Sequence, residues 1–330
     1  MVEQYQTTAT VAAYRALTHV RATKSGGWLG LVILAASLMA NASPSAATAA
    51  QSLPVALSGV FESYSPGTNE VSIILETRRR TLQLRDASAA ARQSLQLARA
   101  GDKITVDVDD AVEPEIATKV EAIQRPVKKY IRLLGLGASA LIVLLAAILA
   151  TRSRPLQLLI GVDNRYSNSQ TQLAIWFAVV AVVYIGTLIL RVAILGLDFV
   201  GGIGITANLA TLTGLSALSF GGAKMITVSK LDASTQSGQA SAKVPAPQPR
   251  LMTDLFTNDH NRADLGDFQM IAVTFTAVAI FAVTAYHWLG FLTISRSVML
   301  PDVDSSLLTG FGLGQGAYLL KKAAVKVGEG

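Results

Sequence analysis

The chain has 330 residues, of which 51% are hydrophobic and only 15% are charged. These fractions are unusual for a soluble globular domain, and together they indicate a membrane protein. The net charge of +6 is not gathered in one long basic run, which argues against nucleic-acid binding, and the absence of cysteine excludes disulfides and thiolate chemistry.

The first segment along the chain, residues 1–49, is predicted to be a signal peptide with its cleavage region. Basic residues precede the short apolar run Trp28–Ala40, and small-x-small sites follow at Ala40–Ala42 and Ala47–Ala49. A basic region, a short apolar stretch and an Ala-x-Ala site are typical of secretory signals. The polar region before the apolar run is long for a signal, so an uncleaved N-terminal anchor is the alternative.

Residues 50–125 are expected to form a β-rich module outside the cytoplasm. Strand-like composition occurs at residues 55–64, 70–76, 81–84, 103–108 and 118–123, and a helix is expected over residues 87–100. About five short strands with one helix fit a small, closed or partly closed β-barrel, and we expect an OB-like topology.

Three consecutive arginines, Arg78, Arg79 and Arg80, stand where a hairpin tip is expected. Contact with anionic lipid headgroups or with an acidic partner is one interpretation. The alternative is a solvated turn without a binding role.

The rest of the chain predicts about five membrane spans. The first transmembrane helix lies within residues 126–157, and the apolar stretches that predict the spans are Ile131–Ala150, Leu173–Leu190, Ile203–Gly222, Gln269–Leu289 and Ser305–Leu320. The last stretch is short and rich in glycine, so a re-entrant or tightly packed helix is its alternative. Arg191, at the end of the second span, is expected to extend outward to the interface.

Residues 158–230 and 251–330 predict two tandem copies of a two-helix membrane repeat. Gln172-Leu173 is echoed by Gln269-Met270 at a separation of about 97 residues. Between the copies, the Ser-, Ala-, Gln- and Pro-rich residues 231–250 predict a disordered cytoplasmic linker. The distribution of Lys and Arg also places the C-terminus in the cytoplasm and the β-module outside it.

Small residues in the two repeats predict close helix packing or oligomerisation, because small side chains let membrane helices approach one another. These residues are Gly214, Ser216, Ser219, Gly310, Gly312, Gly314 and Gly316. A pore or gate where the two repeats meet is the sharper alternative. The spans carry almost no ionisable residues at mid-depth, which argues against coupled transport.

Two polar segments precede helices at similar distances in the two repeats. One contains Asp163 and Arg165, and the other contains Asp259 and Arg262. A cytoplasmic docking face is one hypothesis, and helix-entry turns rich in Asp and Asn are the alternative.

No catalytic, cofactor-binding or metal site is predicted. The chain has no P-loop, no Gly-x-Ser-x-Gly and no His-Glu-x-x-His motif, and its three histidines fall in different segments. We therefore expect no enzyme and no cofactor. The expected partners are the lipid bilayer, further copies of the chain and other membrane or envelope proteins, but not nucleic acid.

Two stretches resemble segments of uncharacterised bacterial inner-membrane proteins. One is Gly161–Gln172 before a Trp-containing span, and the other is Leu300–Leu308 followed by Gly312–Tyr318. The resemblance covers roughly residues 155–325 and implies a bacterial inner-membrane location, without an activity.

Together, these patterns predict an α-helical polytopic membrane protein with a small extracytoplasmic β-module. A non-enzymatic oligomeric scaffold or anchor is the first functional hypothesis. A channel or transporter formed by the duplicated two-helix unit is the alternative.

Overall fold

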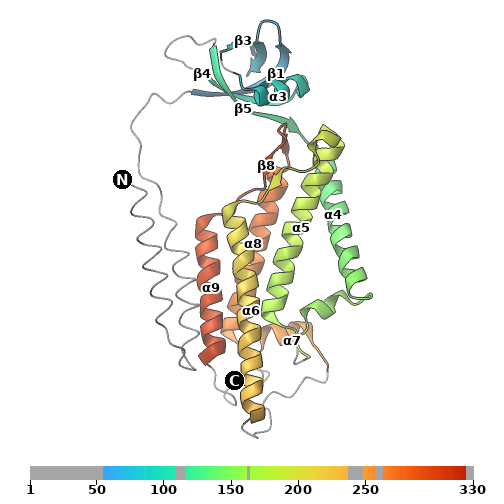
Figure 1. Cartoon of the computed structure of the whole chain (residues 1–330), viewed down its shortest axis with the longest axis vertical. Helices are drawn as coiled ribbons and strands as arrows, with labels where there is room; N and C mark the ends of the chain where they lie inside the picture. The colour runs from blue at the N-terminus through green and yellow to red at the C-terminus, as the bar shows by residue number, and fades with distance from the viewer. Residues whose placement is uncertain are drawn as a thin grey trace, which may run out of the picture. The chain divides into compact units, whose positions relative to one another are not determined.

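The computed structural model describes residues 55–85, 87–108, 116–161, 164–236, 248–257 and 263–324. Within these residues, an antiparallel sheet is followed by a set of long apolar helices (Figure 1). This arrangement agrees with a helical membrane protein that carries a β-module. The predicted signal peptide, residues 1–49, lies outside the described residues.

The β-module contains five strands and one helix among the described residues. The elements are β1 (Val55–Ser65), β2 (Glu70–Leu75), β3 (Arg78–Leu84), α3 (Ala89–Leu97), β4 (Lys103–Val108) and β5 (Ile116–Pro126). The strand order is β3-β2-β1-β4-β5, and β3 pairs again with β5, in parallel, which closes the sheet on itself. On β4, the buried side chains of Ile104, Val106 and Val108 alternate with more exposed ones, as expected for a strand with one face toward a core.

β5 begins two residues earlier and ends three residues later than predicted, and β3 also differs from its predicted range. This strand begins at Arg78 rather than Thr81, and the hairpin tip is Glu76-Thr77, with Glu76 at a φ of 55°. The helix α3 is shorter than predicted because the Ser88 side chain caps it and Ala98 has extended backbone.

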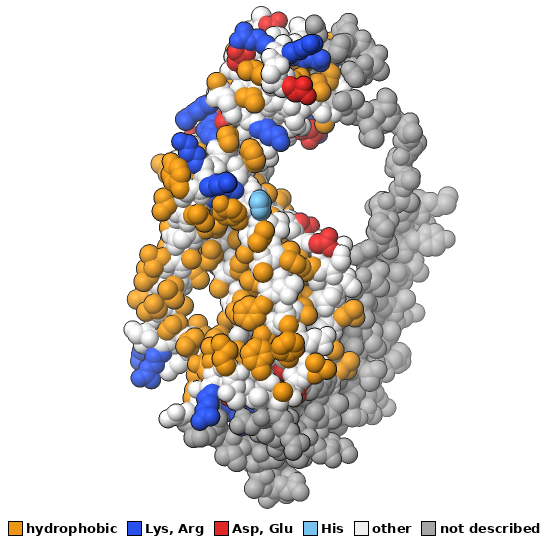
Figure 2. Space-filling view, turned by 180° about the vertical axis from the view of Figure 1, so that it is seen from behind, with side chains coloured by type: hydrophobic (Ala, Val, Ile, Leu, Met, Phe, Trp, Pro, Cys, Tyr) orange, Lys and Arg blue, Asp and Glu red, His pale blue; other side chains and the backbone are white. Residues whose placement is uncertain are grey.

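Four helices in the described residues are long and apolar enough to cross a membrane. They are α4 (Lys129–Ala150), α5 (Asn168–Leu195), α6 (Ala207–Gln236, as far as Ser229) and α8 (Leu265–Trp288). Hydrophobic side chains cover the middle of the helices, and Lys and Arg gather toward the ends of this apolar zone (Figure 2), a distribution that suits a bilayer.

A fifth long helix, α9 (Ser305–Ala324), is not among the four helices that meet the criteria of length and composition for a span. Its crossing of a membrane therefore stays a prediction. α6 begins at Ala207, later than predicted, because Ile203 and Gly204 form a short strand instead. At its other end, α6 continues to Gln236, within the segment predicted to be a linker.

The connections between the helices lie alternately at two ends. At one end are the 3₁₀ helix η1 (Pro155–Leu159) and the short helix α7 (Leu251–Phe256). At the other end are the 3₁₀ helix η2 (Leu197–Phe199) and the strands β6 (Ile203–Gly204), β7 (Phe291–Thr293) and β8 (Val298–Met299). β6 pairs with β8, whereas β7 adds to the β-module by pairing with β5.

The helices α5, α6, α8 and α9 share a core that is organised around Trp176. Its ring centroid lies 5.6 Å from that of Phe281 on α8 and 6.3 Å from that of Phe311 on α9. Its indole Nε1 donates a hydrogen bond of 3.0 Å to Oγ1 of Thr213 on α6. One side chain thus contacts all three neighbouring helices, and its polar atom is satisfied inside the bundle.

The helix α4 packs against α5 through small residues. A Cβ atom added at Gly135 would lie 2.8 Å from Leu190, and one added at Gly186 would lie 3.1 Å from Leu136 and 3.2 Å from Ser139. Beyond this contact, α4 exposes large apolar side chains, including Leu134, which is 70% exposed. α4 is therefore held mainly near its start, where the missing side chains allow close approach.

Replacing Gly135 with Ala should loosen this contact, because the new methyl group would overlap Leu190. We expect the free energy of unfolding in mild detergent to fall by about 1–3 kcal/mol. Gly137→Ala is the matched control, since a Cβ at Gly137 meets nothing within 4 Å. The control should be neutral or stabilising by up to about 1 kcal/mol, and equal effects of the two substitutions would contradict this packing.

Candidate functional site

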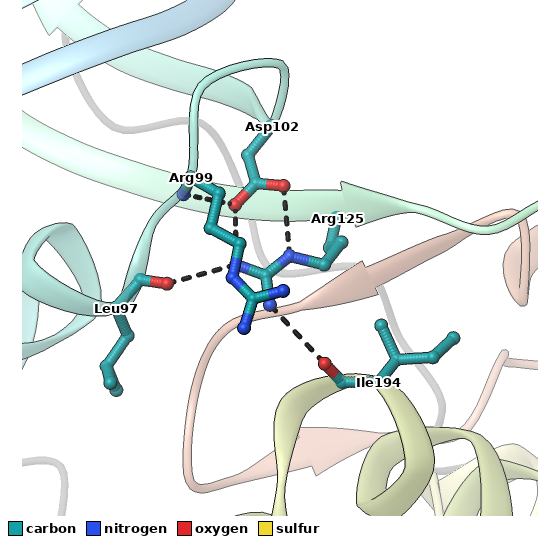
Figure 3. Close-up of polar contacts among 5 residues, drawn as sticks. All are labelled: Leu97, Arg99, Asp102, Arg125 and Ile194. Atoms are coloured by element: carbon teal, nitrogen blue, oxygen red, sulfur yellow. Dashed lines mark hydrogen bonds and ion pairs between the residues drawn. The ribbon is translucent and has the colours of Figure 1, made fainter.

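The junction between the β-module and the helices centres on Arg125, near the end of β5. Its Nε donates to Oδ1 of Asp102 at 3.1 Å and its Nη2 donates to Oδ2 at 2.9 Å, while both residues are buried (Figure 3). Nη2 also donates to the carbonyl of Leu97, and Nη1 donates to that of Ile194 on α5 at 3.4 Å. The guanidinium group therefore joins β5, the turn before β4, the end of α3 and α5.

The position of Asp102 follows from the turn before β4. Gly101 has a φ of 98°, a backbone conformation that glycine adopts without a steric penalty. The following Asp102 carboxylate accepts a hydrogen bond of 2.8 Å from the backbone N–H of Arg99. The carboxylate is thus fixed by the main chain before it meets Arg125, which gives a bidentate, charge-assisted pair.

A backbone ladder makes a second connection at the same place. β5 pairs with β7 at Gln124–Thr293, Arg125–Leu292 and Pro126–Phe291. The crossover after α8 also inserts Ile294 into the core of the β-module, and the crossover after α5 inserts Phe199. The module and the helices therefore share hydrogen bonds and apolar contacts.

Arg191 lies near the end of α5 and is fully buried, which contradicts the prediction that it extends outward. Its Nε donates to the carbonyl of Phe199 at 3.3 Å, and its Nη2 donates to the carbonyls of Ser295 at 2.8 Å and Arg296 at 3.2 Å. The side chain folds back because the two crossovers cover this end of the helix and offer it carbonyl acceptors. It ties together two crossovers that lie about 100 residues apart in the sequence.

A cavity of about 470 Å³ opens between the starts of α6 and α9 and the side of α8. Asn208, Asp302 and Asp304 line its polar part, and Ala277 and Phe281 belong to its apolar part. The amide of Asn208 donates to the carboxylate of Asp302 at 3.0 Å. The cavity thus presents two carboxylates beside an apolar wall that reaches the aromatic core of the bundle.

Asp304 also caps α9. Its Oδ1 accepts a 2.8 Å hydrogen bond from the backbone N–H of Ser306 and another from the Ser306 hydroxyl group. The hydrogen bond from the Ser306 hydroxyl group, and to a smaller degree that from the Ser306 N–H, hold the pKa of the Asp304 carboxyl group below its ordinary value.

The small residues predicted for helix packing occupy different environments. Ser216 and Ser219 are buried in the bundle, whereas Gly214 and Gly310 are exposed and Gly312 is half-buried. A Cβ atom would meet nothing within 4 Å at four of the glycines, namely Gly214, Gly310, Gly314 and Gly316. Contact through these four glycines with another subunit stays a prediction, whereas Gly135, Gly186 and Gly222 make close contacts between helices within the described part of the chain.

Most of the predicted docking residues, Asp163, Asp259 and Arg262, lie outside the described residues. Arg165 lies in the turn before α5, where its carbonyl accepts a 2.8 Å hydrogen bond from the N–H of Gly161. The same end contains a link that the sequence did not suggest, in which the N–H of Tyr166 donates to the carboxylate of Asp254 at 3.1 Å.

The three consecutive arginines lie on β3 with exposed side chains, and the guanidinium group of Arg79 pairs with the carboxylate of Glu62. Contact of these arginines with anionic lipid headgroups or with an acidic partner stays a prediction.

Comparisons of the chain with protein-family models, with curated protein sequences and with solved structures find no match. The most extensive buried polar contacts described above lie at the junction that holds the β-module, at Arg125 and Arg191.

Replacing Arg125 with Met should leave the Asp102 carboxylate buried without its cation. We expect the free energy of unfolding to fall by about 3–5 kcal/mol, since a buried charge has lost its partner. Chemical denaturation of the full chain in mild detergent measures this change. Arg79→Met is the control at an exposed pair and should cost about 0–1 kcal/mol.

The double variant Asp102→Leu with Arg125→Met tests the same pair from the other direction. It should recover much of the lost stability, because neither charge is then buried alone. If the double variant were no more stable than Arg125→Met, the stability lost in Arg125→Met would not come from the unpaired Asp102 carboxylate.

Replacing Asp304 with Ala should fray the first turn of α9, because two hydrogen bonds to Ser306 are lost. We expect faster hydrogen exchange at the backbone amide of Leu308, which donates to the carbonyl of residue 304. Asp304→Asn, which keeps a capping oxygen, is the control and should exchange near the native rate. Fast exchange in both variants would indicate that the charge, rather than the cap, holds the turn.

Proposed function

We propose that this protein is a non-enzymatic, oligomeric inner-membrane scaffold or anchor that presents its β-module outside the cytoplasm. The observation that carries the proposal is the buried Arg125–Asp102 pair, which also contacts Ile194 of the membrane helix α5. A module joined to the helices only by a flexible linker would not require a buried ion pair and shared strand pairing where it meets them. A rigid mounting suits a protein whose task is to hold a surface in a fixed relation to its membrane helices.

The proposal includes an OB-type topology for the β-module. Support comes from the strand order, in which β1 pairs with β2 and β4, and β3 closes against β5. A helix between β3 and β4 completes the set of elements. OB-type barrels are frequent binding modules, so the exposed face of this module is the proposed contact surface for an envelope partner.

The proposal also treats residues 158–230 and 251–330 as two tandem copies of one two-helix unit. An isolated β-bridge joins Ile160 to Tyr166 before α5, and another joins Thr257 to Ala263 before α8, 97 residues later. The hydrogen bonds from the N–H of Ser167 to the carbonyl of Leu159 and from Asp264 to Phe256 have the same spacing. These matched entry turns support a duplicated unit more directly than the sparse sequence echoes do.

Oligomerisation is proposed because two surfaces of the helices lack a partner among the residues that the structure describes. One is the apolar face of α4 that includes Leu134 and Leu149, and the other carries Gly310 and Gly314 of α9. Lipid can cover the first surface, whereas open glycines suit the close approach of another helix.

The deciding experiment is purification of the full chain in mild detergent, with mass analysis of the intact assembly and of the proteins that accompany it. A scaffold should give a discrete oligomer with stable co-purifying envelope proteins, and proteoliposomes containing it should show no flux. A monomer without partners would contradict the proposal.

The alternative is a channel or transporter formed by the duplicated unit. The cavity near Asp302 favours it, because Phe281 lines that cavity and also packs on Trp176 in the centre of the bundle. An aromatic layer beneath a polar cavity has the arrangement that a gate requires. Conductance or solute flux in proteoliposomes, raised when Trp176 and Phe281 are replaced by small polar residues, would support this alternative over the scaffold.

A further inference from the structure

Several buried polar atoms in the helix bundle lack a hydrogen-bond partner in the described part of the chain. Gln172 is 1% exposed and both of its amide atoms, Oε1 and Nε2, are unpartnered. Gln315 is 5% exposed and its Oε1 is unpartnered. The same is true of Oγ1 of Thr171 and Oδ1 of Asn168, on the first turns of α5.

The two glutamines belong to one layer of the bundle. Gln172 precedes Trp176 by four residues and Gln315 follows Phe311 by four residues, so each lies about 6 Å along its helix from an aromatic ring. Those two rings are 6.3 Å apart.

Both glutamines are displaced from the rings toward the same end of the helices. The turn that leads into α5 contacts Asp254 of α7 through the N–H of Tyr166. The later part of α9 reaches the same end, because Tyr318 packs with Met270 near the start of α8. The two glutamines therefore lie at one level of the bundle, on the α7 side of Trp176.

Ser216 of α6 adds a hydroxyl group to this region. It follows Thr213, the partner of the Trp176 indole, by three residues and is 1% exposed. Its hydroxyl donates to the carbonyl of Leu212 at 3.1 Å, which leaves its oxygen able to accept.

Unpartnered amides are costly in such a place. Each buried polar group without a hydrogen bond costs about 1–3 kcal/mol, and more in surroundings that exclude water. Native proteins satisfy the large majority of such groups, with ordered water where no protein partner is available. The natural partner for this layer is a small molecule that both donates and accepts hydrogen bonds.

The charge of the layer restricts what that molecule can be. In the described stretch of α5 from Asn168 to Leu190 there is no Asp, Glu, Lys, Arg or His, and Lys224 of α6 is exposed with its ammonium group over the Phe220 ring. A buried ion would have no counter-charge at the two amides. A neutral ligand therefore fits better than a cation or an anion.

We propose that Gln172 and Gln315 form a binding layer inside the bundle for a small neutral hydrogen-bonding molecule, either water or an amide-like solute, and that Trp176 closes this layer on one side. The proposal does not depend on whether the protein is a scaffold or a channel, because an enclosed layer is compatible with both.

The test uses the full chain in detergent micelles with ¹⁵N-labelled glutamine and tryptophan side chains. Gln172→Met and Gln315→Met assign the two amide signals by their disappearance. We expect both native amide signals to show magnetisation transfer with water, whereas the Trp176 indole N–H, bonded to Thr213, should show none. Amides that transfer magnetisation only to aliphatic protons would overturn the proposal.

Acetamide, added at rising concentration, distinguishes the two occupants. Loss of the water contact at both amides with saturation identifies an amide-like solute as a ligand, and an unchanged water contact identifies water as the occupant. The water contacts are measured on the native chain, and the two variants serve only to assign the signals. The outcome of this experiment is independent of the scaffold proposal, which is tested by the mass of the assembly and by its partners.

Discussion

Two buried guanidinium groups hold the end of the helices to which the β-module is joined. Arg125 satisfies the Asp102 carboxylate and two carbonyl groups, and Arg191 satisfies three carbonyl groups on the two crossovers. Arginine suits this role because its planar fork carries five donors and remains charged. Irregular backbone near a membrane needs such donors, since its carbonyls have no helix partners. The placement of β7, of the β-module and of both helix crossovers depends on these two side chains.

The regular elements were largely predictable because each leaves a local signal. The alternation of Ile104, Val106 and Val108 predicted β4, and long apolar stretches predicted α4, α5 and α8. The junction left no such signal. The strand β7 is only three residues long, and it exists because β5 offers it an edge. Likewise, an arginine at the end of a span is ordinarily expected to extend toward water, and only the fold of the crossovers reveals that carbonyl groups cover Arg191.

Small residues illustrate a second limit of the sequence. Spacing identifies a row of glycines but not the face to which that row turns. Gly135 and Gly137 are two residues apart on α4, yet a side chain at Gly135 would overlap Leu190 and one at Gly137 would meet nothing within 4 Å. The same ambiguity affects Gly310 and Gly314, whose spacing suggested packing although a Cβ atom at either would meet nothing within 4 Å in the described part of the chain. In contrast, Ser216 and Ser219 are inside the bundle.

The helix α9 shows that amino-acid composition alone does not identify every helix that packs into a bundle of this kind. Its glycines and polar residues make it less apolar than the four helices that meet the criteria for a span. It nevertheless packs Phe311 on Trp176 and buries Gln315, so its most informative side chains face protein. A helix covered by its neighbours does not need a wholly lipophilic surface, and it can carry polar groups where partners or water satisfy them. The low hydropathy that weakens α9 as an isolated span is therefore what equips it to line the interior of the bundle.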